Sequence, residues 1–216
     1  MTKAILFDLD GTLLDSAEDL GNVINTVRAR HALPVLPVSH YRPLIGKGVK
    51  SLLQLGLEID ESHPYFQNWV DECLSLYQEQ STEHSRLFPG IDTVLDELDH
   101  LTIPWGIVTN KTSRFTFDIL KFLKLDKRVS CVVCGDTLQY AKPHPAPVLH
   151  ALDEIACEAK DSLFVGDTKV DVEAAHAAGT KVIVALYGYI DQKEDPFTWC
   201  ADGYVEIPKE ILKWVK

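Results

Sequence analysis

The feature that most constrains the fold is an apolar run, Ala4–Phe7, that ends at Asp8 and Asp10. The two acids are separated by one residue and followed by Gly-Thr. A short run without polar alternation is typical of a parallel strand buried on both faces, and open α/β sheets bind ligands at the carboxyl ends of such strands. Two carboxylates this close repel each other, and a shared proton or a bound cation would offset the repulsion. Alone, the segment would more often be an exposed turn rich in Asp and Gly.

Strand-like and helix-like segments alternate over the second part of the chain. The predicted strands cover residues 103–109, 129–134, 162–165 and 180–185, and the predicted helices cover 91–101, 113–124, 146–157 and 170–178. This alternation is typical of a parallel sheet with helices on both faces. Together with the first strand it predicts a doubly wound, Rossmann-like α/β core.

The pattern between the first strand and this alternating region is helical. Ser16 is a suitable N-cap for a first helix, and residues 39–83 show a second helical stretch with no convincing strand. We therefore expect a small all-helical cap domain inserted into the core. The predicted domains are the core, residues 1–15 and 87–216, and the cap, residues 16–86.

The composition is that of an ordinary globular protein, with 216 residues of which 46% are hydrophobic and 25% charged. No apolar run approaches the roughly 20 residues that a membrane span requires. The N-terminus lacks the features of a signal peptide, so we expect a cytoplasmic monomer or homodimer with no membrane contact. The net charge of −11 argues against nucleic acid as a partner, and any phosphate site must be made positive locally.

Five cysteines, an odd number, fit reduced thiols better than a disulfide framework. Cys131 and Cys134 form a C-x-x-C pattern, but residues three apart in a strand point to opposite faces. We expect these two side chains to pack in the core and not to bind zinc or perform redox chemistry.

Four short motifs resemble, in the expected order, those of the haloacid dehalogenase (HAD) superfamily. Residues 8–12 resemble the D-x-D-G-T motif of its phosphatases, and the resemblance continues at residues 107–110, at Lys142-Pro143 and at residues 164–171. Three of the four follow apolar runs. On these motifs the chain is identified as a member of the superfamily, which implies a phosphatase with Mg²⁺ as cofactor.

The resemblance implies a role for each carboxylate. Asp8 would attack phosphorus to form an aspartyl-phosphate, and Asp10 would act as general acid and then general base. The Mg²⁺ ligands would be the side chains of Asp8 and Asp167 and the backbone carbonyl of Asp10. Asp171 would support this metal shell through water or through Lys142.

Phosphate binding would fall to Thr109, Asn110 and Lys142. Thr109 and Asn110 follow a predicted strand and would donate hydrogen bonds to phosphate at the sheet edge, although they could equally cap the next helix. Lys142 lies in a stiff, Pro-containing loop that could hold its amine in place. An ammonium–phosphate attraction at about 4 Å is roughly 1 kcal/mol in water and about 4 kcal/mol at an effective dielectric of 20. A cap that excludes water would therefore strengthen it.

Two stretches bear on the organic part of the substrate. Arg42 and the Gly-Lys-Gly turn at Lys47 resemble the substrate-facing loop of phosphoglycolate phosphatases, although Gly-x-Gly is common at helix starts. The stretch from Tyr187 to Trp199 resembles the N-acetylmuramic acid 6-phosphate phosphatases of cell-wall recycling. Its aromatic side chains could pack on an amino sugar or only seal the loop onto the core. We predict a Mg²⁺-dependent phosphomonoesterase acting on a small phosphorylated metabolite of one of these two classes.

Two alternatives come from other classes of protein. A phosphosugar mutase shares the core but needs cap contacts that reorient the substrate, and we identify none in the sequence. A phosphoacceptor receiver domain, which is not an enzyme, also groups acids, a Thr and a Lys at strand ends. Receivers have no long helical insertion after the first strand, so they fit this chain less well.

Overall fold

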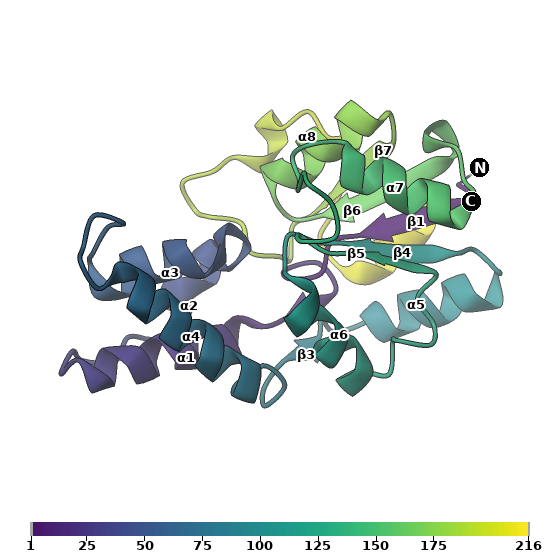
Figure 1. Ribbon diagram of the computed structural model, residues 1–216. Helices are drawn as coiled ribbons and strands as arrows, with labels where there is room; N and C mark the ends of the chain where they lie inside the picture. Colours follow the sequence, from purple (N-terminus) through teal and green to yellow (C-terminus); the bar gives the residue numbers. More distant parts are fainter. Residues whose placement is uncertain (1, 216) are drawn as a thin grey trace. The chain divides into compact units, whose positions relative to one another are not determined.

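The computed structural model describes residues 2–215 of the protein. Within them the chain forms a six-stranded sheet whose neighbouring strands all run parallel (Figure 1). The strand order is β5-β4-β1-β6-β7-β8. The strands are β1 (Ala4–Phe7), β4 (Trp105–Val108), β5 (Cys131–Val133), β6 (Ser162–Gly166), β7 (Lys181–Ala185) and β8 (Gly203–Val205).

Strand β1 occupies the centre of the sheet. Ile5 pairs with Trp105 of β4 on one side and with Leu163 of β6 on the other, and all four residues of β1 are fully buried. The chain runs outward from β1 in both directions, so the carboxyl end of β1 is the switch point at which such sheets bind ligands. The backbone amide of Asp8 continues this ladder by donating to the carbonyl of Val165 at 2.9 Å. The first acid is thereby fixed at the middle of the sheet edge.

Helices cover both faces of this sheet, as the alternating pattern predicted. Figure 1 shows α7 (Ala146–Ile155) and α8 (Lys169–Ala178) over one face, with α5 (Ile91–His100) and α6 (Ser113–Phe122) on the other. Helices α7 and α8 also contact each other. The apolar cluster beneath them includes Val108, Val133, Val148, Leu152, Phe164, Val172 and Val184.

The chain divides into two compact units, one of residues Met1–Leu14 and Leu87–Lys216 and one of Asp15–Arg86. The second unit contains α1 (Ala17–Arg30), α2 (Val38–Tyr41), the 3₁₀ helix η1 (Arg42–Lys47), α3 (Gly48–Leu57) and α4 (Phe66–Gln80). Within it, α1 packs against α2, α3 and α4. A Cβ at Gly56 would lie 2.4 Å from a methyl group of Ile24, so glycine allows α3 to approach α1 closely.

The two segments that join the units pair with each other as a two-stranded sheet, β2 (Leu14–Asp15) and β3 (Arg86–Leu87). The sequence did not reveal these strands because each has two residues. On the helical side, the buried carboxylate of Asp19 accepts hydrogen bonds from the backbone amides of His84 and Ser85, both at 2.8 Å. This carboxylate fixes the returning chain against the start of α1.

The cysteines are unbridged in the described part of the chain. Cys131 and Cys134 are both buried, and burial raises the pKa of the Cys131 thiol to about 12. A thiol of this kind is inert, which agrees with the packing role expected for the pair.

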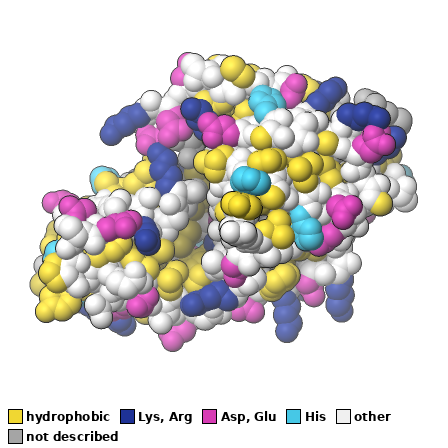
Figure 2. Space-filling view, turned by 45° about the horizontal axis from the view of Figure 1, so that its top comes forward, with side chains coloured by type: hydrophobic (Ala, Val, Ile, Leu, Met, Phe, Trp, Pro, Cys, Tyr) yellow, Lys and Arg dark blue, Asp and Glu magenta, His cyan; other side chains and the backbone are white. Residues whose placement is uncertain are grey.

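The surface carries charges of both signs. Figure 2 shows Lys and Arg side chains scattered among Asp and Glu side chains over one face. Among the helices of the described residues, none combines the length and apolar character needed to cross a bilayer.

Candidate active site

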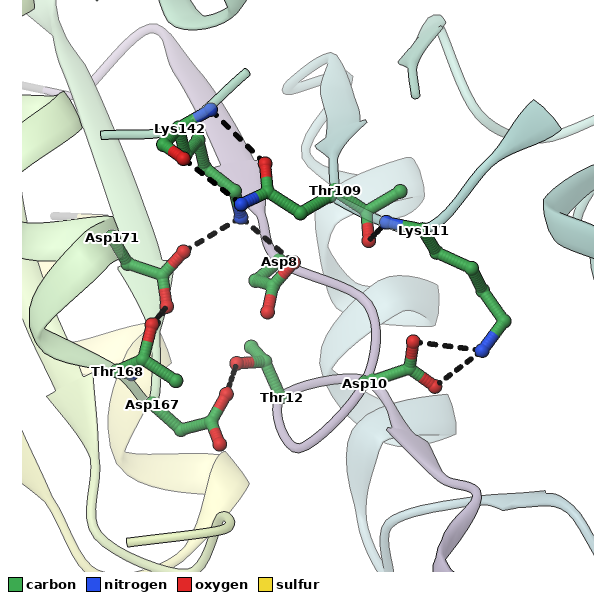
Figure 3. Close-up of polar contacts among 10 residues, drawn as sticks. Asp8, Asp10, Thr12, Thr109, Lys111, Lys142, Asp167, Thr168 and Asp171 are labelled. Carbon is green, nitrogen blue, oxygen red and sulfur yellow. Dashed lines mark hydrogen bonds and ion pairs between the residues drawn. The ribbon is translucent and has the colours of Figure 1, made fainter. Parts of the chain in front are cut away.

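Three buried carboxylates meet at the carboxyl edge of the sheet (Figure 3). Asp8 follows β1 directly, Asp167 follows β6 directly, and Asp171 lies in the first turn of α8. One oxygen from each carboxylate lies within 4.8 Å of the others, and all three residues are buried. The structure thus brings these three acids together, because parallel strands deliver their ends to one edge of the sheet.

Lys142 bridges two of these acids. Its Nζ lies 2.8 Å from Asp8 Oδ1 and 2.6 Å from Asp171 Oδ1, and its side chain is 2% exposed. Burial disfavours its charged form, but the carboxylates of Asp171 and Asp8 outweigh that effect, so the pKa of Lys142 is raised. Lys142 therefore remains an ammonium ion between the two acids.

The side chain of Asn110 holds the peptide of Lys142. Its Nδ2 donates to the Lys142 carbonyl at 2.9 Å, and its Oδ1 accepts from the Lys142 amide at 3.0 Å. Both polar ends of the Asn110 amide are thereby engaged with the loop that carries the lysine. Thr109 lies beside it, and its Oγ1 accepts a hydrogen bond from the Lys111 amide at 3.1 Å.

Burial raises the pKa of Asp8 and of Asp167, whereas it acts to lower that of Lys142. Burial raises the pKa of Asp8 to about 7, and the charge of Asp171 adds to this effect, while Lys142 opposes it. The pKa of Asp167 is also raised, first by burial and then by the charges of Asp8 and Asp171. The acids are thus crowded to the point where their ionised forms need further positive charge.

Asp167 is held by donors from two other loops. Thr12 Oγ1 donates to Asp167 Oδ1 at 2.9 Å, and the backbone amide of Tyr189 donates to Asp167 Oδ2 at 2.8 Å. A Cβ at Gly11, whose φ is +94°, would lie 2.1 Å from Asp167 Oδ2, and one at Gly188 would lie 2.3 Å from Asp167 Cβ. Glycine is therefore required on both sides of this carboxylate.

Asp171 is oriented by a capping box at the start of α8. The amide and Oγ1 of Thr168 donate to Asp171 Oδ2 at 3.0 and 2.6 Å. Because Oδ2 is occupied in this way, Oδ1 faces Lys142. The Thr-x-x-Asp pattern that produces this arrangement is a recognisable helix-start signal.

Asp10 lies away from the three grouped acids and pairs with a lysine that sequence reasoning missed. Lys111 Nζ lies 3.0 and 2.9 Å from the two oxygens of Asp10 (Figure 3), and the two side chains are only 7% and 14% exposed. The only sequence feature that could have indicated a role for Lys111 is its position directly after Thr109-Asn110.

Comparison with known proteins agrees with this geometry. The family model for haloacid dehalogenase-like hydrolases matches residues 5–185. The chain belongs to this family.

The relatives of this hydrolase are named phosphatases. A phosphoglycolate phosphatase of Xanthomonas campestris is 37% identical over 210 residues, which cover 97% of this chain and 94% of that protein. An N-acetylmuramic acid 6-phosphate phosphatase of Pseudomonas aeruginosa is 34% identical, with coverage of 97% and 93%. The crystal structure of a predicted phosphoglycolate phosphatase from Haemophilus somnus superimposes with a TM-score of 0.89 at 30% identity and covers 100% of this chain and 98% of that one. The family and the fold predicted from the sequence are thereby confirmed.

The grouped acids of the hydrolase fit a Mg²⁺ ion. Mg²⁺ prefers oxygen ligands, and Asp8, Asp167 and Asp171 each offer a carboxylate oxygen within 4.8 Å of the others, a grouping that could hold a metal ion. The raised pKa values of Asp8 and Asp167 show the electrostatic cost that a cation there would relieve.

The two residues expected from the cap lie in the helical unit. Both terminal nitrogens of the Arg42 guanidinium contact the Asp15 carboxylate at 3.1 Å. Lys47 is exposed at the junction of η1 and α3, next to Gly48, whose φ is +83°. Two of the five N–H donors of Arg42 are thereby engaged with Asp15.

The aromatic loop contributes structure to the core of the hydrolase. The Tyr187 hydroxyl donates to the Thr12 carbonyl at 3.0 Å, and burial raises the pKa of Tyr187, so this hydroxyl keeps its proton. Tyr189 and Trp199 are buried at 3% and 8% exposure, whereas Phe197 is 62% exposed. Tyr189 and Trp199 therefore seal the loop onto the core.

Proposed function

We propose that this hydrolase is a Mg²⁺-dependent phosphomonoesterase that acts on a small phosphorylated metabolite through an aspartyl-phosphate. The observation that carries the proposal is the grouping of Asp8, Asp167 and Asp171, with Lys142 bonded to two of them. This arrangement provides a nucleophilic carboxylate, a set of hard oxygen ligands and a fixed positive charge at one point of the sheet edge.

Asp8 is the proposed nucleophile. An oxygen of its carboxylate would form a bond to phosphorus while the bond from phosphorus to the ester oxygen breaks. Asp10 would give its proton to the departing alkoxide and later take one from the water that cleaves the aspartyl-phosphate. The Lys142 contact at 2.8 Å fixes the Asp8 carboxylate so that its attack requires no search among rotamers.

Asp8 and Asp167, with the backbone carbonyl of Asp10, would hold Mg²⁺, and Asp171 would support them through Lys142. The ion, when bound, would supply charge that offsets the repulsion between a carboxylate nucleophile and an anionic phosphoryl group. Thr109 is the candidate donor to a phosphate oxygen. Asn110 would act on the phosphate through its backbone amide, because its side chain is bound to the peptide of Lys142.

The substrate class follows from the relatives and from the helical unit, which we propose to be the cap domain. The Xanthomonas and Pseudomonas relatives are named for phosphoglycolate and for N-acetylmuramic acid 6-phosphate. Both compounds carry a carboxylate besides the phosphate. We propose phosphoglycolate as the first candidate substrate, with Lys47 and Arg42 as the cap's candidate contacts to the carboxylate.

The test is release of inorganic phosphate from p-nitrophenyl phosphate with Mg²⁺ by the wild-type protein and by Asp8→Asn. Steady turnover that Asp8→Asn abolishes is expected. One stoichiometric phosphorylation without turnover would instead indicate a receiver-like phosphoacceptor. A screen of phosphorylated metabolites, ranked by kcat/KM, then decides between phosphoglycolate and amino-sugar phosphates. Conversion of a phosphosugar to its isomer without phosphate release would indicate a mutase.

A further inference from the structure

A second lysine, Lys111, lies beside the proposed general acid, Asp10. The Lys111 ammonium contacts both oxygens of the Asp10 carboxylate, at 3.0 and 2.9 Å, and the Lys111 side chain is 7% exposed. Asp10 is the residue that the proposed function places against the ester oxygen of the substrate. The ammonium of Lys111 therefore lies one carboxylate away from the leaving group.

The main chain around Lys111 is fixed at both of its polar atoms. Its amide donates to Thr109 Oγ1 at 3.1 Å, and its carbonyl accepts from the Gly135 amide at 2.9 Å. A Cβ at Gly135 would lie 2.3 Å from the Asn110 carbonyl oxygen, so the two segments approach too closely for any other residue. Because the backbone is held in this way, the lysine is aimed at Asp10 before any substrate binds.

The two lysines near Asp8 have different surroundings. Figure 3 shows Lys142 on the side of Asp8 where Asp171 lies, whereas Lys111 lies on the side of Asp10. Lys142 contacts the carboxylates of Asp8 and Asp171, while Lys111 contacts the carboxylate of Asp10. Lys142 thus provides a positive charge beside the proposed nucleophile and metal site, and Lys111 provides a separate one on the side of the proposed leaving group.

We propose that Lys111 determines substrate specificity by binding a carboxylate carried on the carbon next to the ester oxygen. This inference rests on the proposed function, which sets the leaving oxygen against Asp10. A substrate carboxylate at that position would take one of the two N–H donors that Lys111 gives to Asp10. The Asp10 oxygen released by this exchange would then face the ester oxygen.

The geometry favours one of the two candidate substrate classes. In phosphoglycolate the carboxylate is attached directly to the carbon that bears the phosphoester oxygen, within reach of a cation beside Asp10. In an amino-sugar 6-phosphate the sugar ring separates the carboxylate from the phosphoester. Lys111 therefore selects 2-phosphoglycolate and similar 2-phosphoryloxy carboxylates over phosphates whose second anionic group is remote.

The experiment compares 2-phosphoglycolate with 2-hydroxyethyl phosphate, which has a similar size and no carboxylate. The wild-type protein is expected to favour phosphoglycolate in kcat/KM, and Lys111→Met is expected to reduce this preference about 10- to 100-fold, mainly through KM, as for the loss of a charged hydrogen bond. Lys111→Arg should retain part of the preference. Lys121→Met, which removes an exposed lysine of α6, is the matched control and should leave the preference unchanged.

A second measurement separates recognition from catalysis. In an Asp8→Asn background, calorimetric titration with phosphoglycolate should show weaker binding when Lys111 is replaced by Met, whereas binding of 2-hydroxyethyl phosphate should change little. Equal losses for both substrates would overturn the inference and leave Lys111 as a residue that only positions Asp10.

The two proposals fail in different ways. If the wild-type protein releases no phosphate from either compound, the proposed phosphatase function is wrong. If it hydrolyses both with equal kcat/KM, the phosphatase function stands and the specificity inference is overturned, whether or not Lys111→Met folds.

Discussion

Without a divalent cation, the folding stability of this protein should fall as the pH rises from about 5 to about 8. Burial raises the pKa of Asp8 from 3.8 to about 7 in the folded protein. Between these two values the folded state binds more protons than the unfolded state, so the free energy of unfolding decreases as the pH increases. The contribution of Asp8 is complete below about pH 4 and is lost as the pH passes through 7. The raised pKa of Asp167 acts in the same direction.

The size of the effect follows from the shift. A change of about three pKa units corresponds to about 4 kcal/mol at about 1.4 kcal/mol per unit. About 2 kcal/mol of this falls between pH 5 and pH 7. For a chain of this length, about 1 kcal/mol changes Tm by about 2–4 °C, so Asp8 alone should lower Tm by about 4–8 °C over this range.

The assay is thermal unfolding followed by circular dichroism in chelator at several pH values. The negatively charged protein will have other pH-dependent terms, and Asp8→Asn isolates the contribution of interest because an amide does not titrate. Its Tm should vary less with pH than that of the wild type, whereas Asp153→Asn, an exposed position on α7, should retain the wild-type slope. Mg²⁺ at about 100 times its Kd should add about 2.7 kcal/mol and should act more strongly at pH 8 than at pH 5. Equal pH slopes for wild type and Asp8→Asn would refute the reasoning.

Three further outcomes are expected. Chelator-treated protein should be inactive in a phosphate-release assay and should regain activity with Mg²⁺. Ca²⁺ should restore it poorly, because its longer and more variable coordination loosens the in-line geometry. Full activity in chelator would contradict the metal site. Lys47→Ala should raise KM for phosphoglycolate more than for p-nitrophenyl phosphate in steady-state kinetics, and equal effects would mean that Lys47 does not contact the carboxylate. Gly188→Ala should weaken Mg²⁺ binding about 10-fold or more in calorimetric titration, because its Cβ would lie 2.3 Å from Asp167 Cβ; unchanged affinity would show that the loop moves freely.

The core of the fold could be predicted because each central strand is a buried apolar run that ends at a polar residue. The strand β8 (Gly203–Val205) could not, since its three residues carry no such pattern. It pairs with β7 over these three residues. Asp202 precedes it, and its amide donates to the Val182 carbonyl at 2.9 Å while its carboxylate accepts from the Val182 amide at 2.8 Å. A strand of three residues is too short to show a periodicity that sequence analysis can detect.

The candidate site divides in the same way. Asp8 and Asp167 could be located because each follows a strand, and strand ends converge in a parallel sheet. The contacts that orient them come from residues distant in sequence, such as Thr12 to Asp167 and Asn110 to Lys142, the latter 32 positions apart. Such pairs are set by how the loops pack, which no local pattern records.

The charge balance of the site explains why a metal and a second lysine are both useful there. Among the charged groups of the site, four carboxylates and two ammonium groups leave an excess of two negative charges; the groups are Asp8, Asp10, Asp167, Asp171, Lys111 and Lys142. One divalent cation would neutralise this excess and no more, so a substrate with a phosphate and a carboxylate must find its remaining partners among fixed donors. Lys142 is engaged with Asp8 and Asp171, whose charges the proposed metal site needs, whereas Lys111 contacts Asp10, the acid proposed to act on the leaving oxygen. If a substrate carboxylate replaced Asp10 at Lys111, that carboxylate would be paired with a cation. Asp10 would at the same time be released to act on the leaving oxygen.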